Sequence, residues 1–327
     1  MSDAVKRCPI CEKSINAAFV EGFDRYSIYQ CPNCKLQFSD PLEYDERLYT
    51  GQLDVQGVNN YYSEYMLRSI EYNKEFNLLN LPGYARHALK WVISNIDKKS
   101  IIFDIGCGDG AFLSALLYHD YQAIGSEVDK RRLELFRQCN FNVVGSIDDY
   151  PASLPRPSVV TLFEVLEHVT DPLGFLRNIS AKFPDSLIIV SVPSYKRWSL
   201  RTWRMDSWDY PPNHFTRWTD RTLNILLEKI NYKCKISFPS VLPEDISGSV
   251  MLSLVKGSLH KNKKTLKMHT VPSIVAPIKF ATPEEEHRRR MIKRYIYWPI
   301  STYYNLLGYS GSSMVAIASP NKKSKEN

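Results

Sequence analysis

Two pairs of cysteines near the start of the chain have the spacing of a metal site. Cys8 and Cys11 form one CxxC unit, and Cys31 and Cys34 form another after 19 intervening residues. Two such turns complete a tetrahedral set of four thiolates, which suits zinc. The aromatic and β-branched residues between the two units predict the small sheet of a zinc ribbon. A four-cysteine site has no open coordination position, so we expect a structural role.

A glycine-rich turn at residues 106–110 has the pattern of a nucleotide-binding site. The apolar run 101–105 predicts a buried strand, and residues 111–117 predict a helix. Strand, glycine turn and helix form the first unit of a doubly wound sheet, in which the glycines let the backbone approach a ligand closely. A second strand, 122–126, leads to Glu127, whose carboxylate can accept both hydroxyls of a ribose.

These residues resemble the cofactor loop of class I S-adenosylmethionine-dependent methyltransferases. The matching stretch is Asp-Ile-Gly-Cys-Gly-Asp-Gly at 104–110, followed by Glu127. Residues 163–169, Phe-Glu-Val-Leu-Glu-His-Val, are similar to the fourth-strand segment of the ubiquinone-type branch of that family. The resemblance covers about 84–237 and a last strand near 314–318. It is specific for the fold and the cofactor and says little about the substrate.

The resemblance implies which side chains hold S-adenosylmethionine. Its amino-acid moiety would lie on Asp104, Gly106, Gly108 and Gly110, and its ribose would bind Glu127. Its adenine amino group would contact Asp148. Phe163 and Glu164 would flank the cofactor at the end of the fourth strand. Asp149 is the alternative to Asp148, and both can equally belong to a solvated turn before Pro151.

Two histidines are candidates for the chemistry of methyl transfer. A hydroxyl or carbon acceptor needs a base to remove its proton, and imidazole suits that task. His168 follows the predicted fourth strand, and the resemblance implies that Glu164, Glu167 and His168 can together bind magnesium. The alternative for this trio is a structural role beside the cofactor.

His214 lies in Tyr-Pro-Pro-Asn-His-Phe, residues 210–215, beyond the predicted fifth strand 187–193. Ligands of open α/β sheets bind at the carboxyl ends of such strands. We expect the two prolines to extend this loop and to present His214 to an acceptor. In the alternative interpretation His214 caps the helix that starts near Thr219.

The composition describes a folded chain without a membrane span. Of 327 residues, 44% are hydrophobic and 24% are charged, and the net charge is 42 − 35 = +7. We find no run of 18 apolar residues and no signal-peptide pattern, so we expect a cytoplasmic protein. Paired cysteines in a reducing compartment favour metal binding over disulfides.

The predicted fold is α/β, with a doubly wound, seven-stranded and mostly parallel sheet. We expect a zinc ribbon at 1–42, a linker and cofactor-covering helix at 43–83, the core at 84–239, a helical insertion at 240–311, and a last strand with a tail at 312–327. The covering helix should run from about Glu64 to Leu79. A basic amphipathic helix at 288–304, bending at Pro299, can contact a membrane surface or pair in a homodimer.

The predicted function is methyl transfer to oxygen or carbon of a small-molecule or carbohydrate-type acceptor. Resemblance to zinc-ribbon methyltransferases of glycan and secondary-metabolite pathways favours the sugar. An RNA methyltransferase is one alternative, but the segment 8–34 carries only Lys13 and Arg25 against three acids, so nucleic acid is not the expected partner. The other alternative is a non-catalytic assembly module that keeps the fold.

Overall fold

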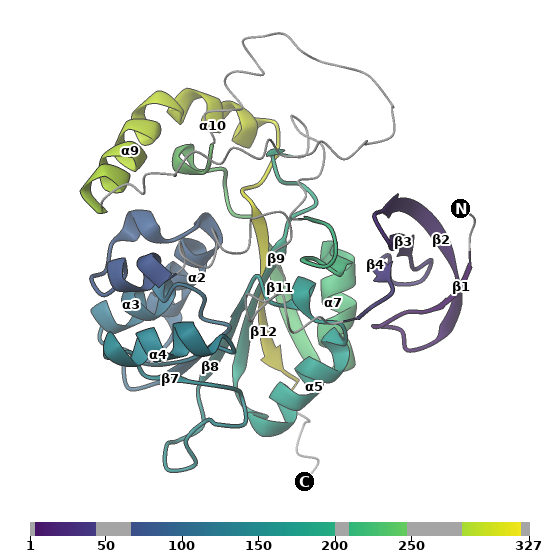
Figure 1. The fold of residues 1–327 in the computed structure, drawn as a ribbon, viewed down its shortest axis with the longest axis horizontal. Coiled ribbons are helices and arrows are strands. Elements are labelled where there is room, and N and C mark those ends of the chain that lie inside the picture. Colours follow the sequence, from purple (N-terminus) through teal and green to yellow (C-terminus); the bar gives the residue numbers. More distant parts are fainter. Residues whose placement is uncertain (1–3, 44–66, 200–208, 247–282, 322–327) are drawn as a thin grey trace.

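The computed structural model describes residues 4–43, 67–199, 209–246 and 283–321. Two sheets organise them: a large sheet in the middle of the chain and a small one that holds the N-terminal strands (Figure 1).

The large sheet has seven strands in the order β11-β12-β9-β8-β5-β6-β7. All neighbours pair in parallel except β12, which runs antiparallel to both β11 and β9. This arrangement confirms the predicted doubly wound, mostly parallel sheet. Across the sheet the strands are β11 Tyr232–Ser237, β12 Ser313–Pro320, β9 Leu187–Pro193, β8 Val159–Phe163, β5 Ile101–Ile105, β6 Gln122–Ser126 and β7 Val143–Val144.

Helices cover both faces of the sheet because its strands are apolar on both sides. All five residues of β5 are buried, and they alternate between the two faces: Phe103 belongs to one apolar cluster and Ile102 to the other. The Phe103 side packs against α5 and α7, and the Ile102 side packs against α2, α3 and α4. The helices are α2 Gly83–Asn95, α3 Ala111–Tyr118, α4 Lys130–Gln138, α5 Pro172–Lys182 and α7 Asp220–Lys229.

Four N-terminal strands and the short strand β10 form a five-stranded antiparallel sheet, which we call the ribbon sheet. Its order is β1-β2-β3-β4-β10, and it lies on the α7 side of the large sheet (Figure 1). Its last strand comes from the body of the protein rather than from the N-terminal segment. The strands are β1 Ala4–Arg7, β2 Ser14–Phe23, β3 Tyr26–Gln30, β4 Gln37–Asp40 and β10 Thr216–Arg217.

A helical segment stands between β11 and β12, beyond the carboxyl ends of the parallel strands (Figure 1). It contains the short 3-10 helix η5 (Pro243–Asp245), α9 (Pro283–Ile296) and α10 (Trp298–Leu306). The expected bend falls at Tyr297, ahead of Pro299, because proline lacks an N–H and is tolerated in the first turn of a helix. None of the described helices is long and apolar enough to cross a bilayer.

The helix predicted to end near Leu79 ends earlier, at Tyr72. Asn73 follows it and is 2% exposed. Its side-chain amide donates to the Asp109 carbonyl (3.0 Å) and accepts from Asn80 (2.9 Å). Continuing the helix would remove the side chain from these buried partners, so the tertiary contact prevails over local helix propensity.

Packing of β6 against the glycine turn gives a stability prediction. A Cβ at Gly125 would lie 2.8 Å from both Cys107 Sγ and Leu113 Cδ1, whereas a Cβ at Gly145 would lie 3.2 Å from Asp149 Oδ2 and 3.7 Å from Leu133 Cδ2. We expect Gly125→Ala to lower the free energy of unfolding by about 1–3 kcal/mol because a close-packed core must shift. Gly145→Ala is the matched control and should be near neutral. Urea denaturation measures both, and equal midpoints would contradict the packing argument.

Candidate functional site

The turn after β5 passes directly over the end of β6. The N–H groups of Gly106 and Cys107 both donate to the Ser126 carbonyl, at 3.0 Å. Gly106 and Gly110 have φ of +70° and +75°, a region that glycine adopts without strain. A Cβ at Gly106 would come within 2.9 Å of Val165, and one at Gly110 within 2.7 Å of Phe136. Sterics and backbone conformation therefore both require glycine at these two positions.

Asp104 and Glu127 lie where β5 and β6 end, at the edge of the sheet formed by the carboxyl ends of the parallel strands, and their carboxylates are buried. Asp104 is 2% exposed and accepts a hydrogen bond from Thr161 Oγ1 at 2.6 Å. Burial raises the pKa of Asp104 to about 7. Glu127 is 5% exposed and accepts from the Asp129 N–H (2.9 Å) and from Arg132 (3.0 Å). A carboxylate offers about four lone-pair sites, so Glu127 retains capacity to accept hydroxyl groups.

The two aspartates predicted near the adenine are exposed, in the turn after β7. Asp148 pairs with Lys182 at 3.2 Å and its side chain is 81% exposed. Asp149 accepts from Ser146 Oγ at 2.9 Å. Their assignment to the adenine stays a prediction.

Sequence reasoning missed Asn73. Its amide holds the Asp109 carbonyl inside the glycine turn, yet it lies 36 residues upstream in a stretch without a motif. An isolated asparagine gives no periodic or spacing signal, so only the tertiary structure identifies it.

The end of β8 brings Phe163 and Glu164 to the same edge. The Phe163 ring packs edge-on against Phe112, with centroids 4.8 Å apart. Glu164 has φ +54°, and its carboxylate accepts from Ser191 Oγ at 2.8 Å. Burial raises the pKa of Glu164. A non-glycine residue in this backbone region costs about 1 kcal/mol or more, and such positions concentrate at functional sites.

Glu167, His168 and His214 form a compact group although they come from two segments of the chain. Their candidate ligand atoms all lie within 4.8 Å of one another. Glu167 is fully buried, and neither of its carboxylate oxygens has a hydrogen-bond partner among the described residues. Burial, reinforced by the charge of Glu164, raises the pKa of Glu167 well above its usual value. Glu164, which the sequence grouped with these residues for magnesium, is not in the cluster, and His214 takes its place.

The two imidazoles are held in different ways. His168 Nδ1 lies 2.7 Å from the Asn213 carbonyl, so this nitrogen carries the hydrogen and donates. Burial, aided by the neighbouring His214, lowers the pKa of His168 to about 3, which keeps the ring neutral. The ring centroids of His168 and His214 are 4.8 Å apart, and His214 Nδ1 lies 3.6 Å from Asp209 Oδ1.

The loop that carries His214 is a tight turn rather than the expected extended segment. The N–H groups of Asn213 and His214 both donate to the Tyr210 carbonyl, at 3.1 Å. Thr219, not His214, caps α7: its hydroxyl accepts from the Thr222 N–H at 3.2 Å.

The four N-terminal cysteines come together at one end of the ribbon sheet. Their sulfur atoms lie within 4.8 Å of one another, with Cys8–Cys34 at 3.6 Å and Cys11–Cys31 at 3.8 Å. Sulfurs at the corners of a zinc tetrahedron with bonds of about 2.3 Å are separated by about 3.8 Å, so the donor set fits zinc. A hydrogen bond from Cys34 lowers the pKa of Cys8 to about 5, while burial and the Cys8 charge raise the pKa of Cys11 to about 11. Four thiolates therefore require a cation.

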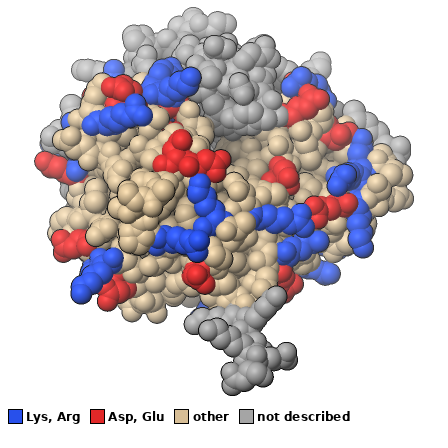
Figure 2. Space-filling view, turned by 90° about the horizontal axis from the view of Figure 1, so that it is seen from below, with Lys and Arg blue, Asp and Glu red and all other residues tan. Residues whose placement is uncertain are grey.

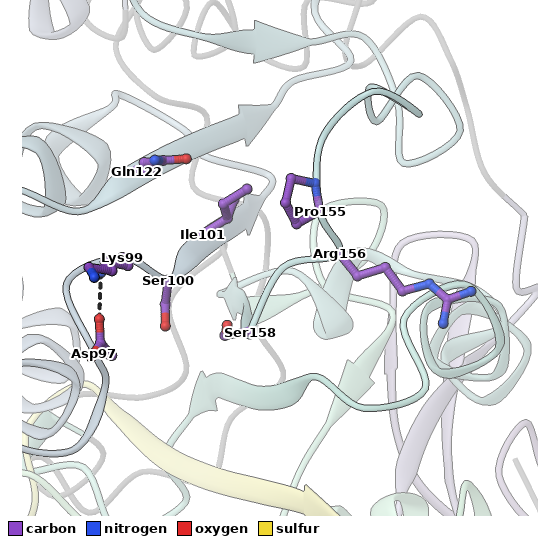
Figure 3. A pocket seen from close by; sticks show the side chains of 8 residues that line it. All are labelled: Asp97, Lys99, Ser100, Ile101, Gln122, Pro155, Arg156 and Ser158. Carbon is purple, nitrogen blue, oxygen red and sulfur yellow. Dashed lines mark hydrogen bonds between the residues drawn. The ribbon is translucent and has the colours of Figure 1, made fainter.

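One hollow, of about 360 Å³, lies at the opposite edge of the sheet (Figure 3). It is lined by the starts of β5 and β6, at Ile101 and Gln122, and by Arg156 and Ser158. Ligands of doubly wound sheets bind at the carboxyl ends of the strands. This hollow is at the amino ends, so it lies away from every predicted site residue.

Comparison with known proteins identifies a methyltransferase domain. Residues 78–235 match the family described as "Methyltransferase domain". No curated protein matches the chain significantly.

Among solved structures, an S-adenosylmethionine-dependent methyltransferase from Archaeoglobus fulgidus is 19% identical over 72% of this chain and 92% of its own, with a TM-score of 0.44. The plantazolicin methyltransferase BpumL, in complex with S-adenosylhomocysteine, is 13% identical over 84% of this chain and 94% of its own, with a TM-score of 0.46. The small RNA methyltransferase HEN1 is 19% identical over 73% of this chain and 25% of its own, with a TM-score of 0.39.

Residues 78–235 thus form a methyltransferase domain. The methyltransferase domain and the doubly wound fold expected from the sequence are confirmed.

The buried Asp104 predicts how folding stability varies with pH. Its folded pKa, about 7, lies above the ordinary 3.8, so the folded state binds a proton that the unfolded state has released between those values. Its contribution to stability is present below about pH 4 and is lost as the pH rises to about 7, a change on the order of 4 kcal/mol. We expect Asp104→Asn, which keeps an acceptor for Thr161, to gain stability over the wild type progressively across this range.

Urea unfolding of ligand-free protein at several pH values between 4 and 8 measures this difference. The comparison with the wild type removes the contributions of Glu164 and Glu167, whose pKa values are raised as well. A difference between variant and wild type that is constant with pH would contradict the assignment.

Proposed function

We propose that this S-adenosylmethionine-dependent methyltransferase methylates an oxygen or carbon atom of a small-molecule or carbohydrate-type acceptor, with His214 as the assisting base. The observation that supports the proposal is the position of His214. It lies beside Glu167 and His168 of the β8 turn, at the carboxyl ends of the parallel strands, and its Nδ1 is 3.6 Å from Asp209 Oδ1.

In the proposed complex the cofactor follows the edge formed by β5, β6 and β8. Its amino-acid part would lie on Asp104 and the turn Gly106–Gly108–Gly110, its ribose on Glu127, and its sulfonium near Phe163 and Glu164. The cofactor supplies an electrophilic methyl group that the acceptor atom displaces in line, so the main task of the protein is to orient the two reactants. The carboxylates of Glu164 and Asp104 would also favour binding of the positively charged cofactor over binding of neutral molecules of the same shape.

The surroundings of His214 support its proposed role as a base. Its side chain is largely buried, with 13% exposed. Asp209, at 3.6 Å, is in turn held by Arg197 at 2.5 Å and can orient the imidazole and stabilise its protonated form. His168 cannot take this role as readily, because a pKa of about 3 leaves it a weak base.

The same cluster supports a second candidate, a divalent cation. The two oxygens of Glu167 have no hydrogen-bond partner in the described part of the chain and lie close to His168 and His214, so they are suitable metal ligands. The magnesium trio suggested by the sequence, Glu164, Glu167 and His168, would require the Glu164 carboxylate to move into the cluster, to which it does not belong. Two imidazoles and one carboxylate suit zinc, iron or manganese better than magnesium. In this alternative His214 would be a ligand and not a base.

We further propose that the four cysteines bind a structural zinc ion, as their separations allow, and that the acceptor is not RNA. Two of the three acids between Cys8 and Cys34 pair with basic residues of the body: Glu12 with Arg177 and Glu21 with Arg217. Figure 2 shows the face at the amino ends of the parallel strands, opposite the candidate site, and basic and acidic side chains are interspersed there. Contact of 288–304 with a membrane and homodimer formation stay open as partner proposals.

The test is an acceptor screen with S-adenosylmethionine labelled on its methyl group. Wild-type protein should transfer label to members of a panel of sugar nucleotides and phenolic small molecules, and not to total RNA. His214→Asn should lower turnover by about 10²-fold or more and leave cofactor affinity unchanged, because a general base contributes about 10²–10⁴-fold.

Two outcomes would decide against the proposal. Label found in RNA alone would establish the RNA alternative. Full turnover by His214→Asn would remove His214 as the base. The same reactions distinguish a base from a metal ligand when they are run on protein freed of loosely bound metal, with and without added Mg²⁺ or Mn²⁺. If His214 is a base, turnover needs no added metal.

A further inference from the structure

The turn that carries His214 is joined to the ribbon sheet by strand pairing. Strand β10 immediately follows this turn, and its two residues pair with β4: Thr216 lies opposite Phe38 and Arg217 opposite Gln37. The pairing extends beyond the strand, because the Ser39 N–H donates to the Phe215 carbonyl at 2.9 Å. The residue next to His214 is therefore hydrogen-bonded to the N-terminal segment.

The other side of the same turn is attached to the β8 turn. The Phe215 N–H donates to the Glu167 carbonyl at 2.8 Å, and the Asn213 carbonyl accepts from His168 at 2.7 Å. His214 thus lies between two residues, each of which is bonded to Glu167 or His168. Its position depends on the ribbon sheet on one side and on the methyltransferase core on the other.

A second connection holds the start of the turn. Glu21, on β2, accepts from Arg217 at 2.6 Å with one carboxylate oxygen and from the Tyr210 hydroxyl at 3.1 Å with the other. Phe23 stacks on the Tyr210 ring, with centroids 4.2 Å apart. The Arg217 guanidinium lies 4.6 Å from the centre of the same ring. Glu21 therefore links the two ends of the segment 210–217 to β2.

We propose that the ribbon sheet helps to form the acceptor site by holding the turn that carries His214, and that Glu21 is a positioning residue for His214. The proposal rests on the role proposed for His214 above. The contacts from the ribbon sheet and the β8 turn restrict where the imidazole can lie. A shift of 1 Å in a reacting group can cost about 10²-fold in rate, so a loosened turn would slow methyl transfer without affecting the cofactor.

The chain offers a matched control in Glu12. It also joins the ribbon sheet to the core, through two hydrogen bonds to Arg177 on α5, at 2.7 and 2.9 Å. This ion pair does not involve the segment 209–217. Both ion pairs are partly exposed, and such pairs contribute little to folding stability. Glu21→Ala and Glu12→Ala should both fold, and should differ only in their effect on the turn.

The first experiment is amide hydrogen exchange, followed by mass spectrometry, on the full-length, zinc-loaded protein. In Glu21→Ala we expect peptides that cover 209–217 to exchange about tenfold faster or more, while peptides that cover β9 are unchanged. Glu12→Ala should exchange as the wild type does in both regions. Equal exchange of 209–217 in the two variants would overturn the proposal, whatever the acceptor is.

The second experiment compares turnover and cofactor affinity in the same variants. Glu21→Ala should lower kcat by tenfold or more and leave the dissociation constant for S-adenosylhomocysteine unchanged, and Glu12→Ala should alter neither. A loosened turn with unchanged kcat would overturn positioning by the ribbon sheet and leave the proposed function intact. Absence of turnover in the wild type would count against the proposed function, while the exchange result would still decide whether Glu21 holds the turn.

Discussion

The parallel pairing of β5, β6, β8 and β9 is the constraint on which the site depends. Parallel strands end at a common edge, so residues that are far apart in sequence meet there without any special local signal. Asp104 lies near the end of β5, Glu127 just beyond β6, and Glu164 just beyond β8. Because β12 is antiparallel to β9, its first residue also lies at this edge, opposite Pro193. Loss of the pairing would remove every candidate contact together.

Burial of several carboxylates at this edge has an electrostatic consequence. Asp104, Glu164 and Glu167 all have raised pKa values, in each case mainly because burial penalises the charged form. The ligand-free edge therefore favours protonated acids. A cationic ligand favours the ionised acids, so its binding should be accompanied by proton release. The ionised forms of these acids therefore lower the stability of the ligand-free fold, and a bound cation would offset that cost.

The sequence was most informative where a regular pattern had a fixed length. The apolar runs 101–105 and 187–193 correspond to β5 and β9 residue for residue, and the two CxxC units do bring four thiols together. It was least informative where a contact joins residues far apart in sequence through a segment of only one or two residues. Strand β10 has only two residues, too few for any periodicity, so its pairing with β4 could not be predicted. Asn73 and the grouping of His214 with Glu167 and His168 likewise depend on tertiary structure alone.

The measurement that most directly tests the account is calorimetric titration of folded, zinc-loaded protein with S-adenosylmethionine and S-adenosylhomocysteine. The central claim is that the edge around Asp104 and Glu127 binds this cofactor. The account predicts saturable binding of one molecule per chain, and an affinity weakened by about 2–3 kcal/mol in Glu127→Ala, the range for hydrogen bonds to a charged group. Thermal unfolding of that variant confirms that it is folded. No binding, or unchanged affinity in Glu127→Ala, would contradict the claim.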